Sequence, residues 1–227
     1  MTEKVYGEIE NYMLKLMQDS AHDRHHIYRV LYYAADIAEH METVDIDVLL
    51  AACLLHDIGR EAQFSDLELD HAQIGGEMAY EFLLSQKWET EKALHVKECI
   101  VTHRFRVDNP PNSIEAKIVF DADKLDITGA LGIARTLAYE GKISEPLYIL
   151  DEEGNIIIAG GGAEFSSFFQ EYNYKLKNVY ASMYTDRARE IAQKRQKTAI
   201  EFYNSLYYEV TENYVNGRNS LKSLLTK

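Results

Sequence analysis

Apolar residues recur every three or four positions along most of this chain, which is the spacing of the buried face of an α-helix. One run, which opens near Asp45, is apolar almost throughout, and it predicts a central, buried helix that ends near Gly59. We expect a polar loop at 60–70. The segments of the first half that we expect to be helical are about 3–18, 20–41, 45–59, 71–85 and 88–104.

The second half of the chain continues this helical pattern with one interruption. The run from Ile114 to about Tyr139 predicts one long helix. Two aliphatic segments on either side of the acidic sequence DEEGN then predict a β-hairpin at about 146–160, and helices follow at about 163–214. We therefore predict a mainly α fold, in which a single domain over residues 1–227 is a helical bundle with one inserted β-hairpin.

Composition and charge exclude several classes of protein. A chain of 227 residues, 46% of them hydrophobic, can bury one core without disulfides. The net charge of −13, from 37 acidic and 24 basic residues, argues against nucleic acid as a partner. We expect no signal peptide and no membrane partner, because the apolar stretches are too short and too often interrupted by charges. Cys53 and Cys99 lie in apolar helical runs, which suits a reducing, cytoplasmic location.

The His56–Asp57 dipeptide at the end of the most apolar helix is the first candidate for chemistry. Burying an imidazole and a carboxylate there costs free energy unless both groups find partners. By itself, such a pair is more typical of a capped structural site than of a metal site. Other helices bring further groups of this kind to apolar surroundings, namely His26, Asp121, Asp123 and Asp126.

Imidazoles and carboxylates together form a mixed nitrogen and oxygen ligand set. Such a set suits Mn²⁺, Fe²⁺, Ni²⁺ or Zn²⁺, and it also admits Mg²⁺. Four protein ligands on an octahedral ion leave two positions open for water and a substrate oxygen, as in a catalytic site. We therefore expect one divalent metal ion as the cofactor.

The ordered segments HDRHHIYRV, LLHDIG and DADKLDITGALGIAR resemble those of the HD superfamily of metal-dependent phosphohydrolases, and in particular the small bacterial HD-domain proteins. The resemblance covers about residues 20–140. It implies a helical HD-domain fold with four metal ligands, which are His26, His56, Asp57 and Asp123. Asp123 is preferred over Asp121 because it stands before KLD.

Two further histidines fit the family pattern, His71 at the start of one helix and His103 at the end of another. Some family members use histidines at such places for a second metal ion, which the Asp of the pair bridges, and others use them to contact phosphate. The alternative is that both are ordinary exposed residues at helix ends. His25, His40 and His95 are assigned to the surface or to packing.

Charged residues near these motifs are candidates for catalysis and substrate binding. Glu61, in HDIGRE, is a candidate to hold or deprotonate the attacking water together with Asp57, and the alternative is a solvated carboxylate. Arg104, Arg106 and Lys124 suit phosphate oxygens, and the alternative for the two arginines is a surface salt bridge.

The function predicted from these residues is hydrolysis of a small phosphate ester or anhydride. Because similar small HD proteins include nucleotide pyrophosphohydrolases and nucleotidases, a nucleotide is the expected substrate. Two alternatives stay open: a cyclic-dinucleotide phosphodiesterase, whose usual GYP signature this chain lacks, and a sensor that binds nucleotide or metal without turnover. The predicted hairpin contains no histidine, so we expect it to shape substrate access or a homodimer contact.

Overall fold

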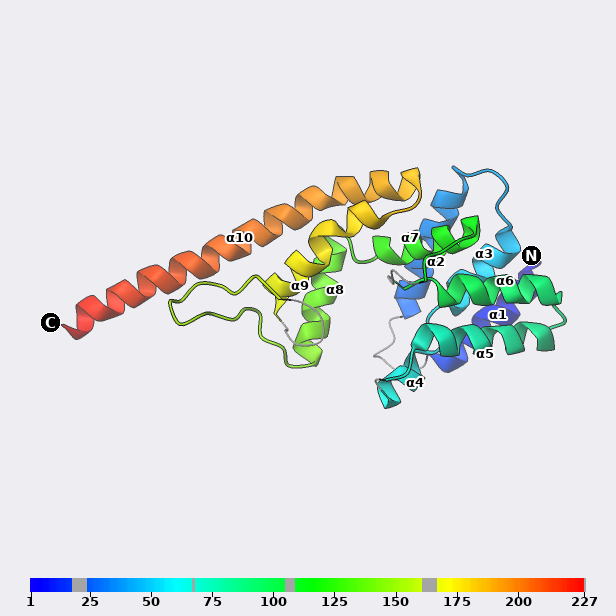
Figure 1. The fold of residues 1–227 in the computed structure, drawn as a ribbon, viewed down its shortest axis with the longest axis horizontal. Coiled ribbons are helices and arrows are strands. Elements are labelled where there is room, and N and C mark those ends of the chain that lie inside the picture. Colours follow the sequence, from blue (N-terminus) through cyan, green and yellow to red (C-terminus); the bar gives the residue numbers. More distant parts are fainter. Residues whose placement is uncertain (18–23, 67, 105–108, 161–166, 227) are drawn as a thin grey trace. The chain divides into compact units, whose positions relative to one another are not determined.

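The computed structural model describes residues 1–17, 24–66, 68–104, 109–160 and 167–226. It is mainly α-helical, as predicted, and its elements form two compact units (Figure 1). Unit 1 consists of Met1–Asp126 and Met183–Ala188, and unit 2 consists of Ile127–Ser182 and Arg189–Lys227. That the whole chain is a single domain stays a prediction. Within the described residues, no helix combines the length and the apolar character that crossing a membrane requires.

Unit 1 is built around α3. Its helices are α1 (Glu3–Leu16), α2 (Arg24–Ala38), α3 (Ile46–Leu55), α4 (Arg60–Ser65), α5 (His71–Ser85), α6 (Thr90–Val101) and α7 (Ile114–Leu125). Asp45 begins α3, because its side chain accepts hydrogen bonds from the backbone N–H groups of Asp47 and Val48. Helices α1, α2, α5, α6 and α7 all contact α3, which explains why its sequence is apolar almost throughout.

Two predictions of helix boundaries near the candidate site are wrong. The stretch 60–70, predicted as a loop, contains α4. The long helix predicted from Ile114 ends at Leu125. The backbone N–H of Asp126 donates to the carbonyl oxygens of Asp123 and Lys124, which closes the last turn of the helix. Asp126 therefore lies at the C-terminus of α7, about one helical turn after Asp123.

Unit 2 has an aromatic core. It contains α8 (Gly129–Lys142), α9 (Phe168–Tyr174), the 3-10 helix η1 (Leu176–Ser182) and most of α10 (Asp186–Leu225). The buried residues of its core are Ile133, Phe168, Tyr172, Leu176 and Ala199. The rings of Tyr172 and Tyr203 stack at a centroid distance of 4.2 Å. The tyrosines of the C-terminal third thus serve, at least in part, to pack α9 against α10.

The β-hairpin predicted at 146–160 is wrong. One isolated antiparallel bridge joins Leu150 to Ile156, and no strand or sheet forms in the part of the chain that the structure describes. A two-stranded hairpin is only marginally stable unless one of its faces is buried. Here Ile156 is buried but Ile158, two residues on, is 43% exposed, so the segment does not present the regular buried face of a strand. Its predicted role in substrate access or in a homodimer contact stays a prediction.

Candidate metal centre

Side chains from several helices of unit 1 converge on the carboxylate of Asp57. The converging residues lie on α2, at the end of α3, on α5, just after α6 and on α7. They form two groups of candidate ligands, His26 with His56 and Asp123, and Asp57 with His71 and His103. Within each group, one ligand atom from each residue lies within 4.8 Å of the others. Residues spread over about half of the chain are thus brought together.

The two oxygens of Asp57 face different histidines. Oδ2 lies 3.7 Å from Nε2 of His26 and 3.7 Å from Nε2 of His56. Oδ1 lies 3.4 Å from Nε2 of His71 and 3.6 Å from Nε2 of His103. The Asp57 carboxylate therefore lies between the two pairs of imidazoles, with one oxygen available to each pair.

All four of these histidines are oriented through the same ring atom. In each ring Nδ1 lies within 2.8 Å of an acceptor oxygen, and the acceptors are Asp126 Oδ2, Cys53 O, Gln63 Oε1 and Ile100 O. Carbonyl and carboxylate oxygens accept, so the proton of each ring is placed on Nδ1. Nε2 is left as the metal-binding nitrogen, and it is Nε2 that faces Asp57 in every case.

The donor set fits a divalent metal ion. Nε2 of His71 is buried and has no hydrogen-bond partner among the described residues, an arrangement that costs free energy unless a ligand completes it. Imidazole nitrogens and carboxylate oxygens together are the donors preferred by Mn²⁺, Fe²⁺, Ni²⁺ and Zn²⁺.

Glycine at position 59 allows α5 to begin beside the His-Asp turn. A Cβ atom on Gly59 would lie 2.2 Å from the carbonyl oxygen of His71 and 2.6 Å from the backbone nitrogen of Gly75, closer than any side chain allows. Asp70 begins α5 by accepting a hydrogen bond from the backbone N–H of Ala72. These two features place His71 in the first turn of α5, next to the residues that follow α3.

Burial shifts two of the histidines, His56 and His71, toward their neutral form. It lowers the pKa of His56 to about 4 and the pKa of His71 to about 3. Burial also acts to lower the pKa of His26, but hydrogen bonds with Asp123 and Asp126 outweigh it and raise this pKa to about 9. At neutral pH, His56 and His71 are therefore ready to bind a metal ion, whereas His26 must first release a proton.

The two carboxylates of the candidate set are ionised. Burial acts to raise the pKa of Asp57, but the guanidinium of Arg60, whose Nε lies 2.9 Å from Oδ1, and the neighbouring imidazoles hold it well below the usual range. The pKa of Asp123 is likewise held well below the usual range against the effect of burial, by Lys124 first and then by His26. Both groups are thus in the form that coordinates a cation.

Asp121, the lesser candidate from the sequence, belongs to neither group. It is fully buried, and its carboxylate accepts hydrogen bonds from the backbone N–H groups of Tyr184 and Thr185 and from the Thr185 hydroxyl, at 2.7 to 2.9 Å. The Thr185 hydroxyl in turn accepts from the N–H of Ala188 in the first turn of α10. Asp121 therefore joins the start of α10 to α7 through hydrogen bonds.

The candidate phosphate contacts lie at the edge of the centre. Nζ of Lys124 lies 2.7 Å from Oδ2 of Asp123 and 3.3 Å from the carbonyl oxygen of His103. Arg104 lies 3.1 Å from Asp70, which is the salt-bridge arrangement that its sequence context left open.

The other predicted residues are placed as follows. Glu61 is exposed in the first turn of α4. Arg106 lies outside the described residues. His25 and His40 are exposed, and His95 lies 3.2 Å from the buried carboxylate of Glu115, so these three lie at the surface or in packing positions, as predicted.

Three residues that contact the centre are not among the metal-binding, catalytic or phosphate-binding residues predicted from the sequence. Arg60 pairs with Asp57, Gln63 accepts from His71, and Asp126 accepts from His26. Two of these contacts could have been predicted from helical spacing. Arg60 follows Asp57 by three residues and Asp126 follows Asp123 by three residues, so each lies close to a candidate ligand.

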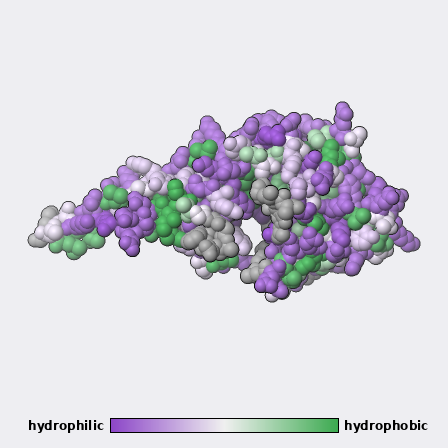
Figure 2. Space-filling view, viewed as in Figure 1, coloured by the Kyte–Doolittle hydropathy of each residue, from purple (hydrophilic) through white to green (hydrophobic). Residues whose placement is uncertain are grey.

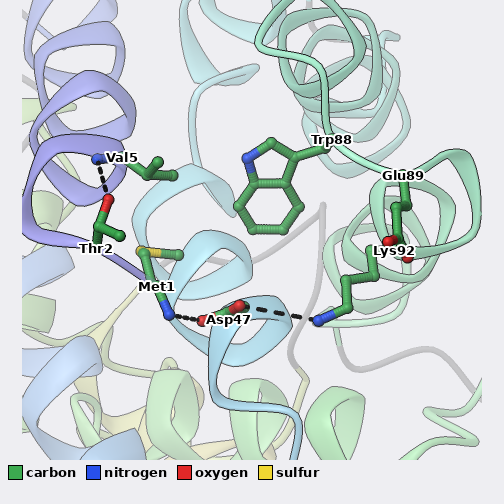
Figure 3. Close-up of a pocket in the computed structure, with 7 residues that line it drawn as sticks. All are labelled: Met1, Thr2, Val5, Asp47, Trp88, Glu89 and Lys92. Carbon is green, nitrogen blue, oxygen red and sulfur yellow. Dashed lines mark hydrogen bonds and ion pairs between the residues drawn. The ribbon is translucent and has the colours of Figure 1, made fainter.

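A separate surface pocket is lined by Met1, Thr2, Val5, Asp47, Trp88, Glu89 and Lys92 (Figure 3). It contains none of the candidate ligands. Its one central carboxylate, Asp47, already contacts the N-terminal amine and lies 3.8 Å from Nζ of Lys92. The candidate ligands of unit 1 therefore lie around Asp57 and not in this pocket.

Fold and site together define a helical protein with a buried His/Asp centre that fits divalent metal. The family model described as HD domain matches residues 24–128, a range that includes every candidate ligand. The chain is also 30% identical over 210 residues to the uncharacterized protein YpgQ of Bacillus subtilis (strain 168), an alignment that covers 89% of this chain and 92% of YpgQ. The chain belongs to the HD-domain family.

Solved structures of similar proteins share this fold. The crystal structure of Bacillus subtilis YpgQ in complex with ADP is 28% identical, with a TM-score of 0.69 over 91% of this chain and 95% of that one. A Lactobacillus plantarum protein is 26% identical, with a TM-score of 0.74 over 93% and 99%. An HD-superfamily hydrolase from Bacillus thuringiensis is 27% identical, with a TM-score of 0.67 over 91% and 97%.

Proposed function

We propose that this protein is a metal-dependent phosphohydrolase that acts on a small phosphate ester or anhydride, and that its substrate is a nucleotide. The observation that carries the proposal is the position of the Asp57 carboxylate between four imidazole Nε2 atoms. Membership of the HD-domain family and similarity to a protein described as an HD-superfamily hydrolase support a hydrolytic reaction. The ADP complex of YpgQ supports a nucleotide as the substrate.

The metal ion is assigned to His26, His56, Asp57 and Asp123. When bound there, a divalent ion supplies an acidified water and polarises a phosphoryl oxygen of the substrate. Mn²⁺, Fe²⁺, Ni²⁺ and Zn²⁺ suit this mixed nitrogen and oxygen set better than Mg²⁺ does. The second oxygen of Asp57 faces the unprotonated Nε2 atoms of His71 and His103, so this pair would hold a second ion. A contact with a phosphoryl oxygen would require a proton on Nε2.

The side chains of the protein perform the remaining steps. Asp57 stays ionised, because its pKa is held well below the usual range, and it orients the attacking water by accepting a hydrogen bond. Glu61, exposed at the start of α4, passes the proton of that water to solvent. Lys124 and Arg104 donate to the phosphoryl oxygens and stabilise the negative charge that builds up during the attack.

The test begins with metal analysis of protein purified without chelator. It continues with a panel of nucleotides, cyclic dinucleotides included, assayed with added Mn²⁺ for released phosphate, pyrophosphate or linear product. We expect bound metal and hydrolysis of a mononucleotide, which is lost with chelator and in a folded Asp57→Ala variant. Metal-loaded protein that binds nucleotides without turnover would support the sensor alternative, and hydrolysis confined to cyclic dinucleotides would support the phosphodiesterase.

A further inference from the structure

Each carboxylate of the candidate metal centre is already paired with a basic side chain. Nε of Arg60 lies 2.9 Å from Oδ1 of Asp57. Nζ of Lys124 lies 2.7 Å from Oδ2 of Asp123. Two more such pairs lie beside the ligands, and they are Asp126 with Arg29 and Asp70 with Arg104. Because each pair is neutral as a whole, these pairs leave no surplus negative charge to offset two divalent ions.

The chain as a whole, by contrast, is acidic. Its net charge is −13, and the face of the molecule shown in Figure 2 is largely hydrophilic. A negatively charged protein attracts cations from solution, so the overall field of this chain favours metal binding. The groups that contact the ligands therefore decide how many ions the centre holds.

Arg60 acts on one part of the centre in particular, which we call the second position. It is the place between Oδ1 of Asp57, His71 and His103. Oδ1 lies 3.4 Å from Nε2 of His71 and 3.6 Å from Nε2 of His103, and the same oxygen accepts from Arg60. A cation bound at the second position would share Oδ1 with a guanidinium, so its binding is weakened by like-charge repulsion.

The pKa of His71 shows the same repulsion. Burial first, and then the charge of Arg60, lower this pKa to about 3. A positive charge on the imidazole is thus disfavoured by the guanidinium, and a positive ion bound to the imidazole meets the same field. The side chain of Asp57 is only 6% exposed, so water screens this field incompletely.

The group of His26, His56 and Asp123 is better supplied with negative charge. Oδ2 of Asp57 faces both of its imidazoles, so an ion held there meets two carboxylates. An ion at the second position meets only the carboxylate of Asp57, which the first ion and Arg60 already share. The first ion therefore binds to the protein alone, whereas the second lacks a counter-charge.

A phosphate group supplies the missing charge. It carries about −1.5 to −2 elementary charges at pH 7, and its oxygens bind divalent cations and guanidinium groups alike. We propose that Arg60 makes binding of the second ion depend on phosphate, so that the free protein holds one divalent ion and the second position fills only together with the phosphate of the substrate. This inference rests on the proposed function, which supplies a phosphorylated substrate. Because the coupling is reciprocal, the second ion tightens phosphate binding by the same factor.

The test counts Mn²⁺ bound to the full-length protein at equilibrium, from the electron paramagnetic resonance signal of the Mn²⁺ left free in solution. Inorganic phosphate is the probe, and a titration without protein corrects for the Mn²⁺ that phosphate itself binds. We expect one ion per chain without phosphate and two with it. The spectrum of the bound ions should change as well, because two Mn²⁺ ions that share the carboxylate of Asp57 interact magnetically.

Three variants separate the charge of Arg60 from its other properties. Arg60→Gln keeps a side-chain donor and removes the charge, so it should bind the second ion without phosphate, at least about tenfold more tightly than the unmodified protein does. Arg60→Lys keeps the charge and should still require phosphate. Lys124→Met removes the same charge beside Asp123, in the other group, and should also still require phosphate. Circular dichroism verifies that each variant is folded.

The proposal is overturned if the unmodified protein binds two ions without phosphate, or if phosphate leaves the count at one. It is also overturned if folded Arg60→Gln requires phosphate as strictly as Arg60→Lys does. If Arg60→Gln does not fold, the counts for the unmodified protein still decide. The proposed function fails separately: a protein that binds its second ion with phosphate but hydrolyses no nucleotide would keep this inference and refute the phosphohydrolase.

Discussion

Nδ1 of His26 and Oδ2 of Asp126 lie 2.7 Å apart, although a hundred positions separate the two residues in the sequence. Asp126 is fully buried, and its carboxylate also accepts from Nε and Nη2 of Arg29 at 2.7 and 3.0 Å. The contact holds the His26 ring so that Nε2 faces Asp57 and Asp123. Asp126 and Arg29 are thus placed to position His26 and not to bind the metal ion themselves.

Asp126→Asn is expected to weaken metal binding by about 10- to 100-fold while leaving the protein folded. An amide cannot accept from both His26 and Arg29 with the full charge of a carboxylate, so the imidazole is less firmly held. Competition of Mn²⁺-loaded protein with a chelator measures the affinity. Asp121→Asn is the control, because it changes a buried carboxylate of the same helix that contacts the start of α10. The control should lower the melting temperature without changing metal affinity, and equal affinities of the two variants would contradict the assignment.

The two groups of candidate ligands should respond differently to loss of one histidine. His56→Ala removes a ligand of the group that includes His26 and Asp123, and we expect this variant to lose its bound metal on dialysis. His71→Ala leaves that group intact, so we expect at least one ion to stay bound while hydrolysis falls. Metal analysis after dialysis, with a parallel assay, separates the two outcomes. If both variants lose all metal, the division into two groups is wrong.

Glu140, in α8 of unit 2, should make the stability of the protein depend on pH. Burial and the charges of Glu145 and Glu171 raise its pKa to about 7, and Oε2 has no hydrogen-bond partner among the described residues. Because its pKa is higher in the folded protein than in the unfolded chain, protonated Glu140 stabilises the folded state. This stabilisation is complete below the usual pKa of 4.5 and is lost as the pH rises through about 7. Glu140→Gln should therefore match the unmodified protein in acid and melt at a higher temperature in alkali.

Thermal melts at several pH values on either side of that range test this prediction. Glu145→Gln serves as the comparison, because it removes a neighbouring charge and leaves the buried carboxyl in place. In alkali, Glu145→Gln should raise the melting temperature less than Glu140→Gln does. A Glu140→Gln variant with the same pH profile as the unmodified protein would show that this carboxyl does not titrate in the folded state.

Gly154 and Gly141 should respond in opposite ways to substitution by alanine. Gly154 has a φ of +93°, and a Cβ there would lie 2.4 Å from Cε1 of Tyr214, so Gly154→Ala should destabilise the protein by about 1 kcal/mol or more. Gly141 lies in the last turn of α8 with open space around its Cα, so Gly141→Ala should stabilise by up to about 1 kcal/mol. Denaturant unfolding measures both. Equal effects would show that Gly154 does not hold the turn against α10.

Local signals explain why much of the helical pattern could be predicted. The helix expected at 71–85 is α5, with the same first and last residues, because Asp70 caps its first turn. The hairpin prediction failed because aliphatic segments become strands only when another strand or a buried surface pairs with them, and Ile158 lacks such burial. The end of α7 at Leu125 was also not predicted, because it too depends on contacts between segments distant in the sequence. Asp126 contacts His26 and Arg29 of α2, and no local sequence pattern predicts these contacts.

The sequence alone determined which residue types stand at which helix ends. Apolar spacing and helix caps are local properties, and they sufficed to place His56 and Asp57 at the end of a buried helix and Asp123 within an apolar one. The tertiary structure decided which side chains meet. Asp121 and Asp123 are two residues apart, so they point to nearly opposite sides of α7. Which of them faces the imidazoles depends on where α2 and the start of α10 pack, and only contacts between segments distant in the sequence set that arrangement.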